Sequence, residues 1–201
     1  MGDTLKNPEQ PCAVILGGAK IGDKIALINN MMDKAELILI GGAMAFTFLK
    51  VQGKNVGSSL IDKDNLKVAE DILALAEKTD TNLVLPVDVV AAQEMAHDEP
   101  WRVAGLDEME DDESGFDIGP ETAMNYELLL TDAKTIIWNG PMGVCEIPAF
   151  ATGTQAIAFA VRDETDDGAV SIIGGGDTAL ALKEMGINDG FTHISTGGGA
   201  S

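Results

Sequence analysis

Short runs of apolar residues alternate along the chain with longer segments of helical periodicity. The apolar runs predict six buried strands, at residues 13–16, 37–40, 83–86, 135–138, 169–173 and 192–195. The intervening segments predict a first helix at residues 20–32, a second that follows residues 41–42 and ends at about residue 50, and a third that starts at Asp62. Further helices are predicted at residues 121–131, 148–162 and 178–185. This alternation predicts βαβ units and hence a Rossmann-like three-layer α/β/α sandwich with a mainly parallel sheet of about six strands.

Residues 97–119 break the alternation, and they are interpreted as an acidic loop. Six of the seven residues from Asp107 to Glu113 are acidic. Neither an internal repeat nor a linker is evident, so residues 1–201 are expected to form a single domain. Three glycines, Gly197 to Gly199, directly follow the last predicted strand. Such a loop opens a helix in this architecture, so we expect the chain to be cut off at its C-terminus.

Charge and composition exclude several classes of function. The 201 residues carry a net charge of −20, which argues against nucleic acids and anionic membranes as partners. No apolar run approaches the ~18 residues of a membrane span. Two cysteines, Cys12 and Cys145, cannot form a disulfide framework, which favours a reducing cytoplasm. The acidity itself has two open interpretations, adaptation to a salty interior or local sequence bias.

Glycines gather where the predicted strands end. Ligands of an open parallel sheet bind at the carboxyl ends of its strands, and glycine lets backbone N–H groups approach them closely. Any one pair is explained by the needs of a βα turn, whereas five clusters at one edge favour a ligand site. The clusters are Gly17–Gly18, Gly41–Gly42, Gly140, Gly174–Gly176 and Gly197–Gly199. Neither G-x-x-x-x-G-K-[ST] nor G-x-G-x-x-G occurs.

Two lysines at the start of the first predicted helix suggest an anion site. Lys20 and Lys24 are four residues apart, so they would share a helix face. They repel each other and meet the positive end of the helix dipole, unless an anion lies between them. The alternative is that both are solvated surface residues, with Asp23 offsetting their charge.

Three further polar residues lie beside the glycines, and each has two interpretations. Asp177 follows three glycines at a helix start, where it is either an N-cap or a ligand of a Mg²⁺–phosphate group. Asn139 and Glu146 flank residues 140–143 and are either site residues or an ordinary turn residue and first-turn acid.

Taken in order, these motifs resemble the C-terminal nucleotide-binding domain of phosphoglycerate kinase. The resemblance covers nearly the whole chain, and as a set the motifs are highly specific. They are GGAK with DK (residues 17–20 and 23–24), GGAMAFTF (41–48), LPVD (85–88), DIGP (117–120), WNGPMGV (138–144), GGGDT (174–178) and STGGGAS (195–201).

The resemblance implies a role for each matching residue. Lys20, with the loop N–H groups of Gly197 and Gly198, would meet the transferring phosphoryl group, and Asp177 would bind Mg²⁺ together with the nucleotide phosphates. Glu146 would contact the ribose, and Gly41, Gly42, Gly115 and Phe116 would form the adenine slot. The remaining nucleotide contacts would be Lys24, Asn139, Pro141, Gly174, Gly175, Gly176 and Thr178.

The family transfers a phosphoryl group between ATP and 3-phosphoglycerate with Mg²⁺, in the cytoplasm and as a monomer. The resemblance implies Mg²⁺ with ATP or ADP as ligands here. The family's other domain carries the basic patch for phosphoglycerate and a catalytic arginine, and neither is found in this sequence. We therefore expect 3-phosphoglycerate to bind only when that domain is present, and the isolated chain to bind nucleotide without turnover. Cys145 and Phe116 replace the family's usual phenylalanine and leucine.

Overall fold

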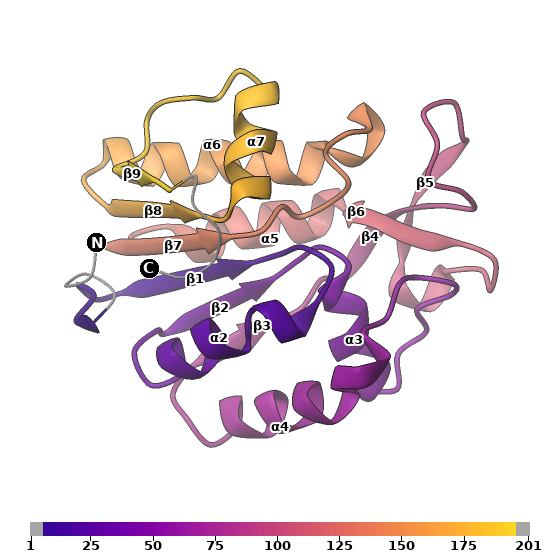
Figure 1. Ribbon diagram of the computed structural model, residues 1–201, viewed down its shortest axis with the longest axis horizontal. Coiled ribbons are helices and arrows are strands. Elements are labelled where there is room, and N and C mark those ends of the chain that lie inside the picture. The colour runs from indigo at the N-terminus through magenta and orange to yellow at the C-terminus, as the bar shows by residue number, and fades with distance from the viewer. Residues whose placement is uncertain (1–5, 196–201) are drawn as a thin grey trace.

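The computed structural model describes residues 6–195, and its centre is one six-stranded parallel sheet (Figure 1). The strand order is β3-β2-β1-β7-β8-β9. The bounds are β1 (Cys12–Leu16), β2 (Leu37–Ile40), β3 (Asn82–Val84), β7 (Thr135–Asn139), β8 (Val170–Gly174) and β9 (His193–Ile194). Helices cover both faces of the sheet, so the predicted three-layer α/β class is confirmed.

Two apolar cores lie on opposite faces of this sheet. Helices α2 (Ile25–Met31), α3 (Met44–Val51) and α4 (Leu66–Ala76) pack on one face, and α5 (Pro120–Leu130), α6 (Thr152–Asp166) and α7 (Gly176–Glu184) contribute to the other. Along β1, Val14 faces the first core and Ile15 faces the second, and both are fully buried. A strand buried on both faces must be apolar at every position, which explains the uninterrupted runs in the sequence.

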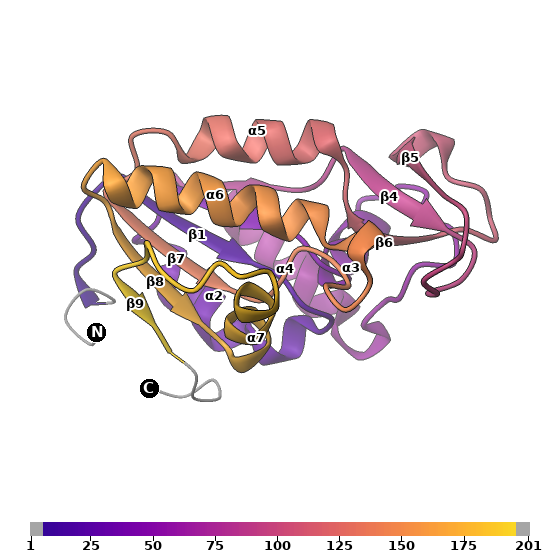
Figure 2. The same cartoon turned by 90° about the horizontal axis from the view of Figure 1, so that it is seen from above.

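A second, three-stranded sheet lies beyond the carboxyl ends of the large sheet (Figure 2). It pairs β4 (Asp88–Ala92) antiparallel with both β5 (Trp101–Gly105) and β6 (Ser114–Ile118). The prediction of a loop over residues 97–119 was therefore wrong for residues 101–105 and 114–118, which form β5 and β6. Residues 97–100 and the acidic stretch between β5 and β6 lie outside strands, and the acidic stretch includes the short 3₁₀ turn η3 (Leu106–Glu108).

The acidic stretch is held against the small sheet by an arginine. Arg102 on β5 donates from Nε to Oε1 of Glu113 at 2.7 Å and from a terminal nitrogen to Oε2 at 2.8 Å. The same terminal nitrogen also donates to the carbonyl of Glu108. A two-point contact of this kind fixes the arginine geometrically, so the β5–β6 turn is tied back to its own strand.

Two helix starts differ from the prediction. The segment predicted as one helix over residues 20–32 is a 3₁₀ turn, η1 (Ile21–Asp23), followed by α2. The turn buries Ile21 completely while its neighbours stay exposed. Asp62 precedes another 3₁₀ turn, η2 (Lys63–Asn65), and makes no side-chain capping bond to it. Its carboxylate instead accepts from the Asn65 side chain at 2.9 Å.

The remaining helices follow the prediction closely, although η4 (Pro148–Phe150) is a separate 3₁₀ turn before α6. Within residues 6–195, the structure contains no helix with the length and apolar character that crossing a membrane requires.

Tyr126 of α5 joins its helix to the large sheet through one hydroxyl group. The side chain is fully buried, and the hydroxyl donates to the carbonyl of Ile40 at 2.6 Å, with the carbonyl of Val84 at 3.2 Å. Burial raises the pKa of this phenol. The contact fastens α5 at the carboxyl ends of β2 and β3.

We expect Tyr126→Phe to lower the free energy of unfolding by about 1–3 kcal/mol, because it leaves a buried carbonyl without its donor. Urea unfolding monitored by circular dichroism measures the change. Leu128→Ala, on the exposed face of α5, is the control and should stay within about 0.5 kcal/mol of the wild type. Equal stability of Tyr126→Phe and the control would contradict the assigned contact.

Candidate functional site

The strand order places a topological switch point between β1 and β7. From β1 the chain builds outward through β2 and β3, and it then returns to β7 on the other side of β1. Ligands of open α/β sheets bind in the crevice where the order reverses, outside the carboxyl ends of the strands. The loops after β1 and β7 lie where the order reverses, and Figure 2 shows these two strands side by side.

These two loops are joined directly through their backbones. The amide of Gly17 donates to the carbonyl of Asn139, and the amide of Gly18 donates to the carbonyl of Pro141, both at 3.0 Å. A Cβ atom on Gly17 would overlap the Pro141 carbonyl, and one on Gly140 would overlap the backbone of Gly17. The close contact between the two loops therefore accounts for these two glycines without any ligand.

Lys24 reaches across the switch point to the other loop. Its Nζ donates to Oδ1 of Asn139 at 2.5 Å. Burial lowers the pKa of the Lys24 ammonium, and the nearby carboxylates of Asp23 and Asp177 partly oppose this. The structure therefore brings together three residues that the sequence assigned to the site, Lys24 before α2, Asn139 at the end of β7 and Asp177 in the first turn of α7.

Lys20 is placed differently from the expectation. It lies in extended backbone (φ −119°, ψ 128°) before η1, so the prediction that it shares a helix face with Lys24 was wrong. Its side chain is exposed and has no hydrogen bond or ion pair with residues 6–195. It remains on the same loop, on the carboxyl side of β1.

The start of α7 forms the third side of the site. Gly175 occupies the N-cap position with φ +88°, a conformation that favours glycine. Asp177 lies inside the first turn and is exposed, so the N-cap interpretation of Asp177 was wrong. Thr178 is fully buried, and its hydroxyl oxygen accepts the amide of Gly140 at 2.7 Å. The first N–H groups of the helix, including those of Gly176 and Asp177, have no carbonyl partner within the helix.

The residues predicted for the adenine slot are only partly accessible. Gly115 is buried against the ring of Phe46, and Gly41 is buried against the sulfur of Met142. A cavity of about 10 Å³ lies between these segments, which is room for roughly one water. Gly42 and Phe116 are half-buried. Their contact with adenine stays a prediction.

The other predicted residues also lie along this edge. Gly174 ends β8 beside the Asn139 amide, and Glu146 is exposed in the loop after β7. Gly197 and Gly198 lie outside the described residues. Between residues 6 and 195, no three His, Cys, Asp or Glu side chains are grouped so that they could hold a metal ion.

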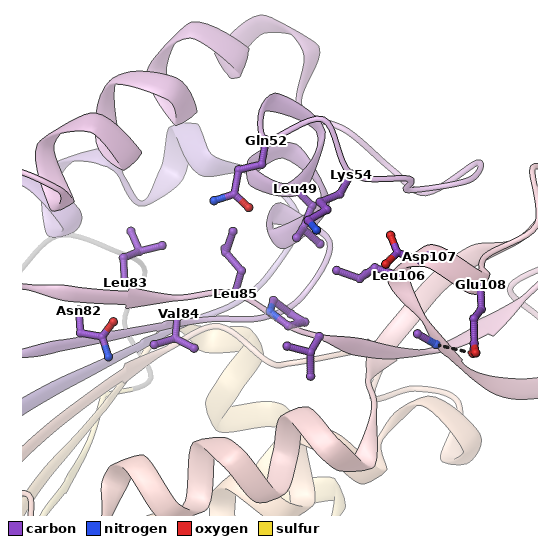
Figure 3. A pocket seen from close by; sticks show the side chains of 13 residues that line it. Leu49, Gln52, Lys54, Asn82, Leu83, Val84, Leu85, Leu106, Asp107 and Glu108 are labelled. Carbon is purple, nitrogen blue, oxygen red and sulfur yellow. Dashed lines mark hydrogen bonds between the residues drawn. The ribbon is translucent and has the colours of Figure 1, made fainter.

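A roomier cavity than the one beside Gly115 lies elsewhere. A groove of about 610 Å³ lies beside β3, between the end of α3 and η3 (Figure 3). None of the predicted site residues lines it. Its cation, Lys54, is accompanied by Asp107 and Glu108, and Glu108 accepts the amide of Gly105 at 3.2 Å. Because the predicted site residues gather at the switch point, we place the candidate site there instead.

Sequence reasoning missed two buried polar residues behind the loop that follows β7. Asp117 on β6 accepts the amides of Gly153 at 2.7 Å and Ile118 at 2.9 Å. Thr154 accepts the amide of Met142 at 2.9 Å. Asp117 stands in a motif that the sequence singled out, but no role was assigned to it, since a buried acid and an exposed one look alike in sequence.

The fold and the position of the site define a Rossmann-like α/β/α protein with its candidate ligand site at the switch point of a parallel sheet. The family model described as phosphoglycerate kinase matches residues 1–201. The chain therefore belongs to the phosphoglycerate kinase family, and the resemblance recognised in its sequence is confirmed.

Individual relatives agree with this assignment. The chain is 50% identical over 201 residues to phosphoglycerate kinase of Prosthecochloris aestuarii, covering 100% of this chain and 51% of that protein. It is 52% identical over 196 residues to phosphoglycerate kinase of Thermosipho africanus, covering 97% of this chain and 49% of that protein. The structure of phosphoglycerate kinase from Coxiella burnetii superimposes with a TM-score of 0.93 at 41% identity, over 98% of this chain and 50% of that one. The chain thus spans about half the length of the relatives it matches.

Because Asp177 raises the pKa of Lys24, we expect Asp177→Asn to lower that pKa further. A titration of the lysine ¹³Cε chemical shift by NMR measures it. Asp167→Asn, at the far end of α6, is the control and should leave the Lys24 titration where it is in the wild type. An unchanged Lys24 pKa in Asp177→Asn would show that the two side chains do not interact.

Proposed function

We propose that this chain is the nucleotide-binding half of a phosphoglycerate kinase. It binds Mg²⁺-ADP or Mg²⁺-ATP at the switch point, for reversible phosphoryl transfer between 1,3-bisphosphoglycerate and ADP. The observation that carries the proposal is the convergence of Lys24, Asn139 and the start of α7 on one crevice. Family membership supports the choice of reaction.

The charges at the crevice favour a polyphosphate. Lys24 is a partly desolvated cation whose opposing charges are carboxylates, and an anionic ligand would offset its burial. The free N–H groups at the start of α7 and the helix dipole attract phosphate oxygens. Lys20, exposed and unpaired with any residue of the described chain, is available for the group being transferred.

Phosphoryl transfer needs positioning and charge neutralisation more than a covalent nucleophile. In this proposal Lys24 leaves Asn139 and binds nucleotide phosphates, while the backbone at Gly175 and Gly176 holds them at the helix start. Glu146, exposed on the loop after β7, is assigned to the ribose. The half-buried Phe116 is assigned to the base.

The donor set suits Mg²⁺ only when a nucleotide is bound. Mg²⁺ usually binds through one or two carboxylates together with substrate phosphates and water. Asp177 is an exposed carboxylate at the helix start, and no metal-binding group of three side chains is found in the described part of the chain. When bound, the ion would supply positive charge to the phosphates.

We expect the chain to bind Mg²⁺-ADP at one site, and Asp177→Ala to weaken this binding about tenfold. The loss should disappear when ADP is titrated without Mg²⁺, because only the metal-dependent contact is removed. Isothermal titration calorimetry measures both affinities, and circular dichroism checks that the variant is folded. Asp167→Ala is the matched control. The absence of any heat with millimolar Mg²⁺-ADP would refute nucleotide binding, and an Mg²⁺ dependence equal to wild type would refute the metal role.

The 201-residue polypeptide alone is expected not to turn over 3-phosphoglycerate. The second substrate is also an anion, and the net charge of −20 repels it. Neither arginine contacts a residue of the candidate site in these ion pairs, since Arg102 is bound to Glu113 and Arg162 lies 4.0 Å from Asp189. The complementary half of the kinase would have to supply the binding groups and exclude water.

A coupled assay with ATP, Mg²⁺ and 3-phosphoglycerate tests this expectation on the purified chain, with an intact kinase of the family as positive control. Activity at ordinary kinase rates, roughly 1–100 per second, would show that this half is sufficient.

A further inference from the structure

Asp117 is a buried acid without a cationic partner. It is 4% exposed, and its carboxyl group makes no ion pair with residues 6–195. Burial raises its pKa to about 8, while its two amide hydrogen bonds act in the opposite direction. Burying a carboxyl group costs free energy unless hydrogen bonds compensate for the lost water, so the contacts of Asp117 are essential to its position.

The first contact is to a helix start. Oδ2 accepts the amide of Gly153, which belongs to the first turn of α6. The local N-cap residue, Ala151, has no side chain that could accept this bond. Asp117 therefore caps α6 from strand β6, and it lies 36 residues before Gly153 in the sequence.

The second contact is to the loop between β7 and α6. A Cβ atom on Gly143 would lie 2.5 Å from Oδ1 of Asp117, so the loop backbone packs directly on the carboxyl group. The next loop residue, Val144, donates its amide to the carbonyl of Phe116 at 2.9 Å. On the other side, the hydroxyl of Thr154 accepts the amide of Met142. The loop is thus fastened to β6 and to α6 around Asp117.

Two residues that we assign to the nucleotide lie on either side of the junction between β6, the β7–α6 loop and the start of α6. Phe116 precedes Asp117 on β6, and its ring centroid lies 5.0 Å from that of Phe150 in η4, the 3₁₀ turn before α6. Glu146 follows the fastened part of the loop. The relative position of base and ribose contacts depends on the junction that contains Asp117.

We propose that Asp117 is a positioning residue that holds Phe116 and Glu146 in the spacing required by one nucleoside. This inference rests on the proposed function, since it concerns the same nucleotide site. A carboxyl group offers an oxygen to each of its two amide donors, whether or not it carries a proton. Asparagine has one oxygen, and its NH₂ group would face one of these N–H donors. The side chain would then shift against the loop backbone at Gly143, which packs directly on it.

The test is a double-mutant cycle on Mg²⁺-ADP affinity, measured by calorimetry in the wild type, Asp117→Asn, Glu146→Gln and the double variant. We expect Asp117→Asn to weaken binding about tenfold when Glu146 is present. In the Glu146→Gln background it should weaken binding less than about twofold, because its effect is exerted through Glu146. A merely structural role would lower stability and leave the affinity of the folded protein unchanged.

Asp88 provides a matched control. It is also buried, at 5% exposure, and it accepts the amides of Glu121 and Thr122 at the start of α5. Asp88→Asn should lower the melting temperature and keep the Mg²⁺-ADP affinity within about twofold of wild type. Equal affinity losses in Asp88→Asn and Asp117→Asn, or equal losses with and without Glu146, would overturn the inference.

A measurement on the wild type decides the case in which Asp117→Asn does not fold. Saturation with Mg²⁺-ADP should slow hydrogen exchange of the Gly153 and Val144 amides about tenfold and leave the Glu121 and Thr122 amides unchanged, since coupling between site and junction is reciprocal. Unchanged exchange at Gly153 and Val144 overturns the inference. Wild-type protein that binds no Mg²⁺-ADP defeats the proposed function and this inference together, whereas normal affinity of folded Asp117→Asn defeats only the inference.

Discussion

The direct backbone contact between the loops after β1 and β7 is the constraint on which the site depends. The Gly17 amide and the Asn139 carbonyl meet without any side chain between them, and the two strands behind them are paired in parallel. This contact brings Lys24 within reach of Asn139. It also places the end of β7 against α7, because the Gly140 amide is bound by Thr178. Cation, amide and helix start therefore converge through main-chain geometry.

The proposed function requires an acidic protein to bind an anion, and the same arrangement provides the charges for it. The chain carries 33 acidic residues and 13 basic ones, so its average field repels phosphate. At the switch point, the half-buried Lys24 and the N–H dipoles at the start of α7 oppose that field locally. These dipoles do not appear in any count of charged residues. Backbone dipoles keep their orientation when salt screens the surface charges. Fixed dipoles are therefore well suited to a chain of this composition.

Much of the large sheet could be predicted from sequence, because a strand buried on both faces needs an unbroken apolar run. The small sheet could not, since Trp101 and Val103 on β5 are exposed and the acidic turn beside them dominates the pattern. The break between η1 and α2 was also missed, because the periodicity of the segment continues through it. For the site, position along the chain located Lys24, Asn139 and the start of α7. Asp117 could not be located in this way, because it is held by the amide of Gly153 and the spacing of residues in the sequence does not indicate that contact.

The distance in sequence between Lys24 and Asn139 has a consequence for folding. They are 115 residues apart, and β1 cannot acquire its β7 neighbour until most of the chain exists. Closing a loop of that length costs conformational entropy before the contact can stabilise the chain. Topologies rich in such contacts therefore fold slowly. During synthesis the N-terminal strands and α2 to α4 can pack first, with one edge of β1 open. The contact between Lys24 and Asn139 is therefore expected to form late in folding, after β1 has acquired β7 as its neighbour.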